Sequence, residues 1–230
     1  MRIIAYFINY NDSFYIPFLA KHYLKFCEKV IMFDNYSSDG SRAVAELFGF
    51  EVRLFGRPGI LDDQHYLDVK NHCWKEQRGK GIDFVIIVDA DEFVFIDSLH
   101  EENKIPKVTG YNMISEILPQ EDITEIKTGD YSESYSKQAI FNPDAMIEIN
   151  YVHGCHVNRM VSESEKSGEC RLLHYRQIGG VQRMLDRHAA YRKRLSPFNL
   201  KHKMGVHYTH SDEAKFEEWK VLTSQAKELW

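Results

Sequence analysis

Apolar and polar residues follow a repeating order along the first hundred residues. Apolar stretches typical of strands alternate with segments that carry apolar residues at helical spacing. The predicted strands span residues 2–8, 29–35, 51–55 and 83–88. The predicted helices span residues 13–28 and 61–78, and residues 37–50 are predicted as a turn and a short helix that ends near Gly49. Strands that alternate with helices form parallel β-α-β units, and burial on both faces makes such strands continuously apolar. This half of the chain therefore predicts a three-layer α/β arrangement.

The pattern weakens beyond Asp97. Short strand-like pieces are followed by a basic helix and then by an amphipathic helix. These elements are predicted at residues 107–113, 134–141, 145–152 and 169–175, then 180–195, then 212–229. Because no repeat or linker interrupts the chain, we predict one domain over residues 1–230. It would consist of a parallel α/β half (1–97), a mixed half (98–195) and a C-terminal helical extension (196–230).

Composition and charge narrow the classes of function. The formal net charge of −5 argues against a nucleic-acid binder that relies on overall positive charge. The four cysteines lie far apart in the sequence, which is typical of reduced thiols. No apolar run approaches the roughly 18 residues of a membrane span, and the first residues lack the pattern of a signal peptide. We therefore predict a cytoplasmic protein without a transmembrane segment, and leave peripheral membrane contact and homo-oligomer formation open.

Two of the predicted strands end in polar side chains. Asp34 and Asn35 follow one strand, and Asp89 and Asp91 follow another. The carboxyl ends of parallel strands gather at one edge of a sheet, where ligands bind. Two carboxylates one residue apart repel each other, and a hard cation such as Mn²⁺ or Mg²⁺ relieves that repulsion while binding phosphates. Acids also solvate strand ends or cap helices, but the shared edge favours a site for a metal ion and a diphosphate.

The same residues carry a resemblance to a known family. The stretch 9–41, which ends in "FDNYSSDGS", and "VDADEF" at 88–93 resemble the family 2 glycosyltransferases, in particular the branch with a D-x-D-E-F motif. The resemblance covers about residues 2–97. It implies a glycosyltransferase-A fold, with a Rossmann-like, mostly parallel sheet flanked by helices. It also implies a UDP- or GDP-linked sugar donor, a carbohydrate or glycolipid acceptor, and a divalent metal ion.

The resemblance implies roles for individual residues as well. It places the donor against polar side chains of the first half and basic side chains of the second, namely Asn9, Asp34, Asn35, Asn71, Asp89, Lys137, Arg183 and Arg187. It implies that the metal is held by the acid pair and by a histidine of the second half, so the candidates are Asp89, Asp91, His156 and His174. An inverting transfer also needs a carboxylate base. The candidates for that base are Glu116, Glu121 and Asp122.

Three other classes of protein share parts of this pattern. A metal-dependent phosphohydrolase also uses D-x-D after a parallel strand, but usually after its first strand. A sugar nucleotidyltransferase has a Gly-rich basic loop where this chain has "NYNDSFY" at 9–15. A non-catalytic sugar-binding protein could keep the sheet, although the intact acid pair argues against it. The sequence decides neither the nucleotide, nor the sugar, nor the acceptor.

Overall fold

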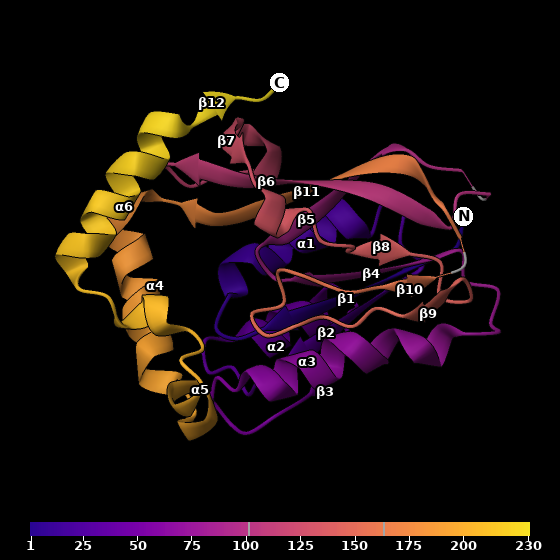
Figure 1. The fold of residues 1–230 in the computed structure, drawn as a ribbon, viewed down its shortest axis with the longest axis horizontal. Coiled ribbons are helices and arrows are strands. Elements are labelled where there is room, and N and C mark those ends of the chain that lie inside the picture. Colours follow the sequence, from indigo (N-terminus) through magenta and orange to yellow (C-terminus); the bar gives the residue numbers. More distant parts are fainter. Residues whose placement is uncertain (101, 163) are drawn as a thin grey trace.

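The computed structural model describes residues 1–100, 102–162 and 164–230. Two five-stranded sheets form the body of the protein, and the C-terminal helices lie along one end of it (Figure 1). One sheet is almost entirely parallel and is flanked by helices. The structure therefore confirms the predicted α/β class with a parallel-rich sheet.

The first sheet has the strand order β3-β2-β1-β4-β8. The strands are β1 (Ile3–Asn9), β2 (Lys29–Asp34), β3 (Glu51–Leu54), β4 (Phe84–Asp89) and β8 (Ile140–Phe141). All neighbours are parallel except β8, which runs antiparallel to β4. Asn9 lies opposite Asp34, and Ile8 lies opposite Asp89. The polar ends of β1, β2 and β4 therefore meet at one edge, as the sequence predicts.

Burial on both faces explains why the strands of this sheet are continuously apolar. Successive side chains of a strand point to opposite faces. Ile3, Ala5 and Phe7 of β1 accordingly belong to one hydrophobic cluster, while Ile4 and Tyr6 belong to the other. All five are at most 4% exposed. The central strand is thus fixed by packing from two sides.

The helices between these strands are shorter than predicted. They are η1 (Ser13–Tyr15), α1 (Ile16–Tyr23), α2 (Ser41–Leu47), α3 (Asp63–His72) and η2 (Cys73–Gln77). Helix α1 ends early because the chain must return to the sheet, where the Glu28 amide already donates to the Ile3 carbonyl. The predicted helix 61–78 changes to a 3₁₀ turn at Cys73, where Trp74 is fully buried and its indole donates to the Asn71 carbonyl.

The second sheet has the strand order β12-β7-β6-β11-β5. Its strands are β5 (Glu92–Ser98), β6 (Ile105–Ser115), β7 (Thr128–Tyr131), β11 (Lys166–Ile178) and β12 (Lys227–Glu228). Strand β11 pairs antiparallel with β5 and parallel with β6. The prediction was a mostly parallel sheet followed by a mixed second half, and this second sheet is built mainly from strands of that half. Only Ala90 and Asp91 separate β4 of the first sheet from β5 of the second.

The remaining elements connect or cover the two sheets. They are η3 (Ile123–Glu125), η4 (Glu133–Tyr135), and the small hairpin of β9 (Met146–Glu148) and β10 (Val161–Ser162). The strand predicted over 134–141 is wrong for its first part, since η4 and the following turn occupy it. Gly110 of β6 makes this turn possible, because a Cβ there would lie 2.1 Å from the Tyr135 carbonyl carbon.

The C-terminal helices cross one end of both sheets (Figure 1). They are α4 (Gly180–Arg194), α5 (Pro197–Lys201), η5 (Val206–Thr209) and α6 (Asp212–Gln225). Trp219 of α6 packs with Met184 of α4 and Ile114 of β6. Helix α6 ends before the predicted residue 229 because β12 pairs with β7 from Lys227. Within the described residues, no helix is both long and apolar enough to cross a membrane.

Candidate functional site

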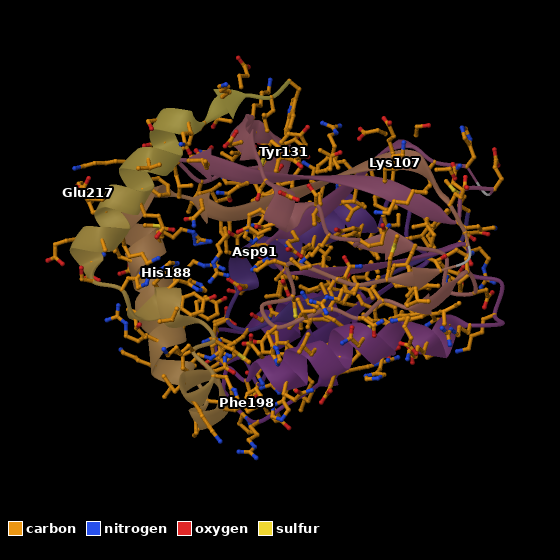
Figure 2. The ribbon with its side chains drawn as sticks, viewed as in Figure 1. Asp91, Lys107, Tyr131, His188, Phe198 and Glu217 are labelled. Carbon is orange, nitrogen blue, oxygen red and sulfur yellow. The ribbon has the colours of Figure 1, made fainter. Side chains whose placement is uncertain are left out.

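The acid cluster lies at the junction between the two sheets. Asp89 is the last residue of β4, and Glu92 is the first residue of β5. The carbonyl of Asp91 accepts a hydrogen bond from the Tyr175 amide of β11 (2.8 Å), which fixes the turn between the sheets. Figure 2 shows Asp91 near the centre of the molecule, between the strands and helix α4. The acids therefore end a buried strand because the chain changes sheets there.

A cavity of about 150 Å³ lies against this junction. It is at the carboxyl ends of β1 and β4, the place where open parallel sheets bind ligands. Side chains from both sheets and from the C-terminal helices line it. They include Asn9, Tyr10, Asp12, Asp63, Tyr66, Lys70, Asp89, Asp91, His156, His174, Arg176, Tyr191, His207 and Tyr208.

Two buried lysines neutralise the first part of the acid cluster. Lys70 Nζ of α3 lies 2.8 Å from Asp89 Oδ2, and its side chain is only 1% exposed. Lys137 Nζ lies 2.6 Å from Glu92 Oε1 and 3.9 Å from Asp89 Oδ2. Burial raises the pKa of Glu92, but Lys137 and Lys70 outweigh this effect and lower the pKa to about 2. Glu92 is therefore ionised at neutral pH.

Two arginines and a histidine surround Asp91. Its Oδ2 lies 3.0 Å from Arg187 Nη2 and 3.9 Å from Arg176 Nη1, and its Oδ1 lies 3.5 Å from His174 Nε2. Burial raises the pKa of Asp91, yet His174 and the two arginines hold it well below its usual range. Arg187 also pairs with Asp12, whose Oδ1 lies 3.0 Å from Nη1. Asp91 is thus a buried, ionised carboxylate with cations on one side.

The four predicted metal ligands, Asp89, Asp91, His156 and His174, all line the cavity. The charges around them nevertheless do not fit a divalent cation. Lys70 and Arg187 already contact Asp89 Oδ2 and Asp91 Oδ2, and like charges 4 Å apart repel by about 4 kcal/mol near a protein surface. Within residues 1–100, 102–162 and 164–230, no group of three or more His, Cys, Asp or Glu side chains is arranged to hold a metal. The Mn²⁺ or Mg²⁺ site stays a prediction that these contacts disfavour.

Asp34 and Asn35, which were predicted to contact the nucleotide, do not line the cavity. Both are fully buried. Asp34 accepts hydrogen bonds from Asn9 Nδ2, from the Ser37 amide and from the Ser37 hydroxyl. Asn35 donates to the Phe55 and Arg57 carbonyls and accepts from Arg194. Both side chains therefore hold loops together at the end of β2.

Asn9, at the end of β1, does line the cavity. Its Nδ2 donates to Asp34 Oδ1 (2.9 Å) and Ser37 Oγ (3.0 Å). Its Oδ1 is buried and has no hydrogen-bond partner in the part of the chain that the structure describes. A buried hydrogen-bond acceptor without a partner lowers the stability of the folded protein. Asn9 is therefore a lining residue with a hydrogen-bond acceptor that no described residue uses.

Replacing Asp34 by alanine should destabilise the protein by about 2 kcal/mol and leave ligand affinity nearly unchanged. The alanine would leave the Ser37 amide and Asn9 Nδ2 without their buried acceptor, and hydrogen bonds to charged groups contribute about 1.5–3 kcal/mol each. Urea unfolding would give the stability, and calorimetry with nucleoside diphosphates would give the affinity. Lost affinity with unchanged stability would restore Asp34 to the binding site.

Three residues predicted to bind the donor have structural contacts instead. Asn71 accepts from the Tyr151 amide (2.7 Å) and does not line the cavity. Lys137 is fully buried against Glu92. Arg183 lies over the ring of Phe14, 4.8 Å from its centroid. Arg187 does not line the cavity either, but it reaches the site through its contact with Asp91.

None of the three predicted catalytic bases lines the cavity. Glu116 accepts a hydrogen bond from the Trp219 indole (2.8 Å), which ties the end of β6 to α6. Glu121 is exposed on the following loop. Asp122 caps η3 by accepting from the Thr124 amide and pairs with Lys21. These acids organise the loop after β6, and a catalytic base among them stays a prediction.

Other side chains of the cavity were not predicted from the sequence. Asp12 follows β1 in the stretch 9–15, and burial raises its pKa even though Arg187 opposes this effect. Arg176 lies two residues after His174 on β11, so both side chains are on the same face of the strand. That period of two is the one sequence signal that would have identified Arg176. Lys70 carries no such signal, because its burial depends on tertiary packing.

Comparison of the sequence with protein-family models and with characterised proteins finds no match.

Proposed function

We propose that this protein is a glycosyltransferase of the glycosyltransferase-A fold that moves a sugar from a nucleotide-diphosphate sugar to an acceptor hydroxyl. The observation that carries the proposal is the position of the cavity. It lies at the carboxyl ends of β1 and β4 and contains the acid pair together with Arg176 and Lys70. Ligand sites of open parallel sheets occur there, and the cations provide partners for a diphosphate. The resemblance of residues 2–97 to family 2 glycosyltransferases supports the same conclusion.

The size of the cavity limits how much of the donor it holds. Pockets for drug-sized ligands have volumes of roughly 300–1,000 Å³, whereas this cavity has about 150 Å³. It has room for the diphosphate and part of the sugar. Gly205, His207 and Tyr208 form one wall, so the nucleotide must extend past this segment or displace it. A carbohydrate or glycolipid would then provide the acceptor hydroxyl.

The chemistry needs a proton acceptor and stabilisation of the leaving group. The acceptor oxygen forms a bond to the anomeric carbon while the bond from that carbon to the diphosphate oxygen breaks, and its electron pair stays on the diphosphate. Cations at the cavity wall stabilise that developing charge. Asp12 is the carboxylate best suited to take the acceptor proton, because it lines the cavity and burial raises its pKa. Inversion at the anomeric carbon follows from a single displacement of this kind.

Replacing Asp12 by asparagine should lower kcat by about 100-fold, the lower limit for a lost general base. Asparagine keeps the shape of the side chain but cannot take a proton, so donor affinity should change much less than kcat. Steady-state kinetics and donor calorimetry would separate the two effects. Asp97→Asn removes a carboxylate from an exposed pair with Arg171 and serves as the matched control. Equal loss of kcat in both variants would exclude Asp12 as the base.

A screen of donors tests the proposed function directly. Thermal shift with UDP- and GDP-linked sugars, each with and without Mn²⁺, would identify the ligand, since a ligand at 100 times its Kd stabilises by about 2.7 kcal/mol. Release of nucleoside diphosphate from the stabilising donor would show turnover. Stabilisation without release, even with a range of acceptors, would instead indicate a sugar-binding protein. No stabilisation by any nucleotide sugar would overturn the proposal.

A further inference from the structure

Arg176 is a cation of the cavity wall whose ion pair with a carboxylate is long. Its Nη1 remains 3.9 Å from Asp91 Oδ2, the carboxylate oxygen with which it is paired. Its Nη2 donates to the Tyr208 hydroxyl (2.9 Å), and its guanidinium lies 4.6 Å from the Tyr191 ring centroid and 5.5 Å from that of Tyr208. The two rings stack on each other at 4.9 Å. The guanidinium is thus held in one orientation with its side chain 18% exposed.

Lys70 contributes a second cation to the same wall. Its ammonium group contacts Asp89 Oδ2 at 2.8 Å and lies 5.9 Å from the Tyr151 ring centroid. An ammonium group has three donors, so this contact leaves hydrogen-bonding capacity for a second anion. Lys70 and Arg176 come from different halves of the chain and line one cavity.

The acids at the junction are paired with cations of this chain. The ion pairs form two groups, each with two carboxylates and two cations: Asp89 and Glu92 with Lys70 and Lys137, and Asp12 and Asp91 with Arg176 and Arg187. In a metal-dependent site the two carboxylates of a D-x-D pair are free to face the ion, because the ion is their counter-charge. Here Lys70 and Arg187 already provide the counter-charge of Asp89 and Asp91.

We propose that Arg176 and Lys70 bind the diphosphate of the donor directly, and that Asp89 and Asp91 hold the cations in place instead of chelating a metal ion. This inference rests on the proposed glycosyltransferase function and specifies how the donor is recognised. Arg176 provides the planar fork that suits phosphate oxygens, and Lys70 provides a compact charge. Asp89 and Asp91 are then positioning residues. Donor binding becomes independent of Mn²⁺ and Mg²⁺.

Calorimetry on protein stripped of metal tests this inference, with inorganic pyrophosphate as the first probe and UDP and GDP as the second. We expect pyrophosphate to bind in the presence of EDTA, and Mn²⁺ to change its affinity by less than about threefold. Arg176→Ala should weaken binding by about 10- to 100-fold, the value of one or two charge-assisted hydrogen bonds. Arg171→Ala is the matched control, because it removes an arginine of the same strand whose partner is the exposed Asp97.

The outcomes separate this inference from the proposed function. If pyrophosphate and nucleotide bind only with Mn²⁺, direct binding of the diphosphate by Arg176 and Lys70 is wrong. The proposed glycosyltransferase function is unaffected by that result. If pyrophosphate binds but no nucleotide does, the proposed glycosyltransferase function is wrong and Arg176 belongs to an anion-binding site. If Arg176→Ala unfolds, Arg176→Lys keeps the charge but loses the fork, and it should still bind more weakly than the wild type. Unchanged pyrophosphate affinity in a folded Arg176 variant would exclude Arg176 from the binding site.

Discussion

Replacing Glu92 by glutamine should lower the free energy of unfolding by about 3–5 kcal/mol, the usual effect of removing one partner of a buried ion pair. The side chains of Glu92 and Lys137 are both 0% exposed, and their nearest charged atoms lie 2.6 Å apart. Glutamine would leave the buried Lys137 ammonium group without its nearest counter-charge, since Asp89 Oδ2 is 3.9 Å away. Guanidinium chloride unfolding of both proteins at neutral pH measures the difference. A change below about 1 kcal/mol would show that water reaches Lys137.

A double variant provides the control for this result. Glu92→Gln combined with Lys137→Met removes both charges, and replacing a whole buried pair by neutral residues is often close to neutral for stability. We expect the double variant to recover most of the loss seen in Glu92→Gln. A double variant no more stable than the single variant would mean that the loss comes from packing and not from an unpaired charge.

The same pair should also make the protein sensitive to acid. The pKa of Glu92 is about 2 in the folded protein, below the value of about 4.3 for an unperturbed glutamate. A lowered folded pKa stabilises the protein above the unfolded pKa, and this contribution is lost as pH falls through the folded pKa. Stability from Glu92 should therefore decline between about pH 4.3 and 2. Unfolding curves across that range should show a steeper decline for wild type than for the double variant.

Local sequence pattern predicted the first sheet well, because its strands are buried on both faces. Val85 to Val88 are at most 1% exposed, so the apolar run itself identifies the strand. The same pattern failed at β5. Phe93 and Val94 are as apolar and as buried as β4, and nothing local shows that the two residues after Asp89 carry the chain into another sheet. Assignment to a sheet depends on the partner strand, which for β5 is β11, about 80 residues away.

The candidate site was predictable where it depends on strand ends and not where it depends on packing between distant segments. Asp89 reaches the cavity from the end of β4, Asp91 from the turn that follows it, and His174 from β11. The cations could not be assigned from pattern. Lys70 looks like one more polar residue of an amphipathic helix, and only the fold shows that its ammonium group is buried against Asp89.

The proposed base, Asp12, was not identified from the sequence for a related reason. An acid in a loop faces the site only if that loop folds over the sheet edge, and sequence spacing does not contain this information. Glu121 and Asp122 lie in a loop that η3 closes on itself through its cap. Asp12 lies between β1 and η1 and lines the cavity.

Asp91→Asn should lower the free energy of unfolding by about 3 kcal/mol, in the range for a broken buried ion pair. Repulsion between two carboxylates would predict the opposite sign, since removing one charge would relieve it. The contacts decide between these effects. Asp91 Oδ2 lies 3.0 Å from Arg187, and Lys70 neutralises Asp89 at 2.8 Å. The attraction that asparagine removes therefore exceeds the repulsion that it relieves.

Unfolding of metal-free wild type and Asp91→Asn, each repeated with Mn²⁺, measures both effects at once. We expect the variant to be less stable with and without Mn²⁺, and Mn²⁺ to stabilise neither protein. Asp97→Asn breaks an exposed pair with Arg171 and should change stability by no more than about 1 kcal/mol. A metal site would give the reverse pattern: the metal-free variant would melt at a higher temperature than wild type, and only wild type would gain stability from Mn²⁺. Because the two arrangements of charge predict opposite signs, this pair of measurements decides whether Asp91 holds arginines or a metal ion.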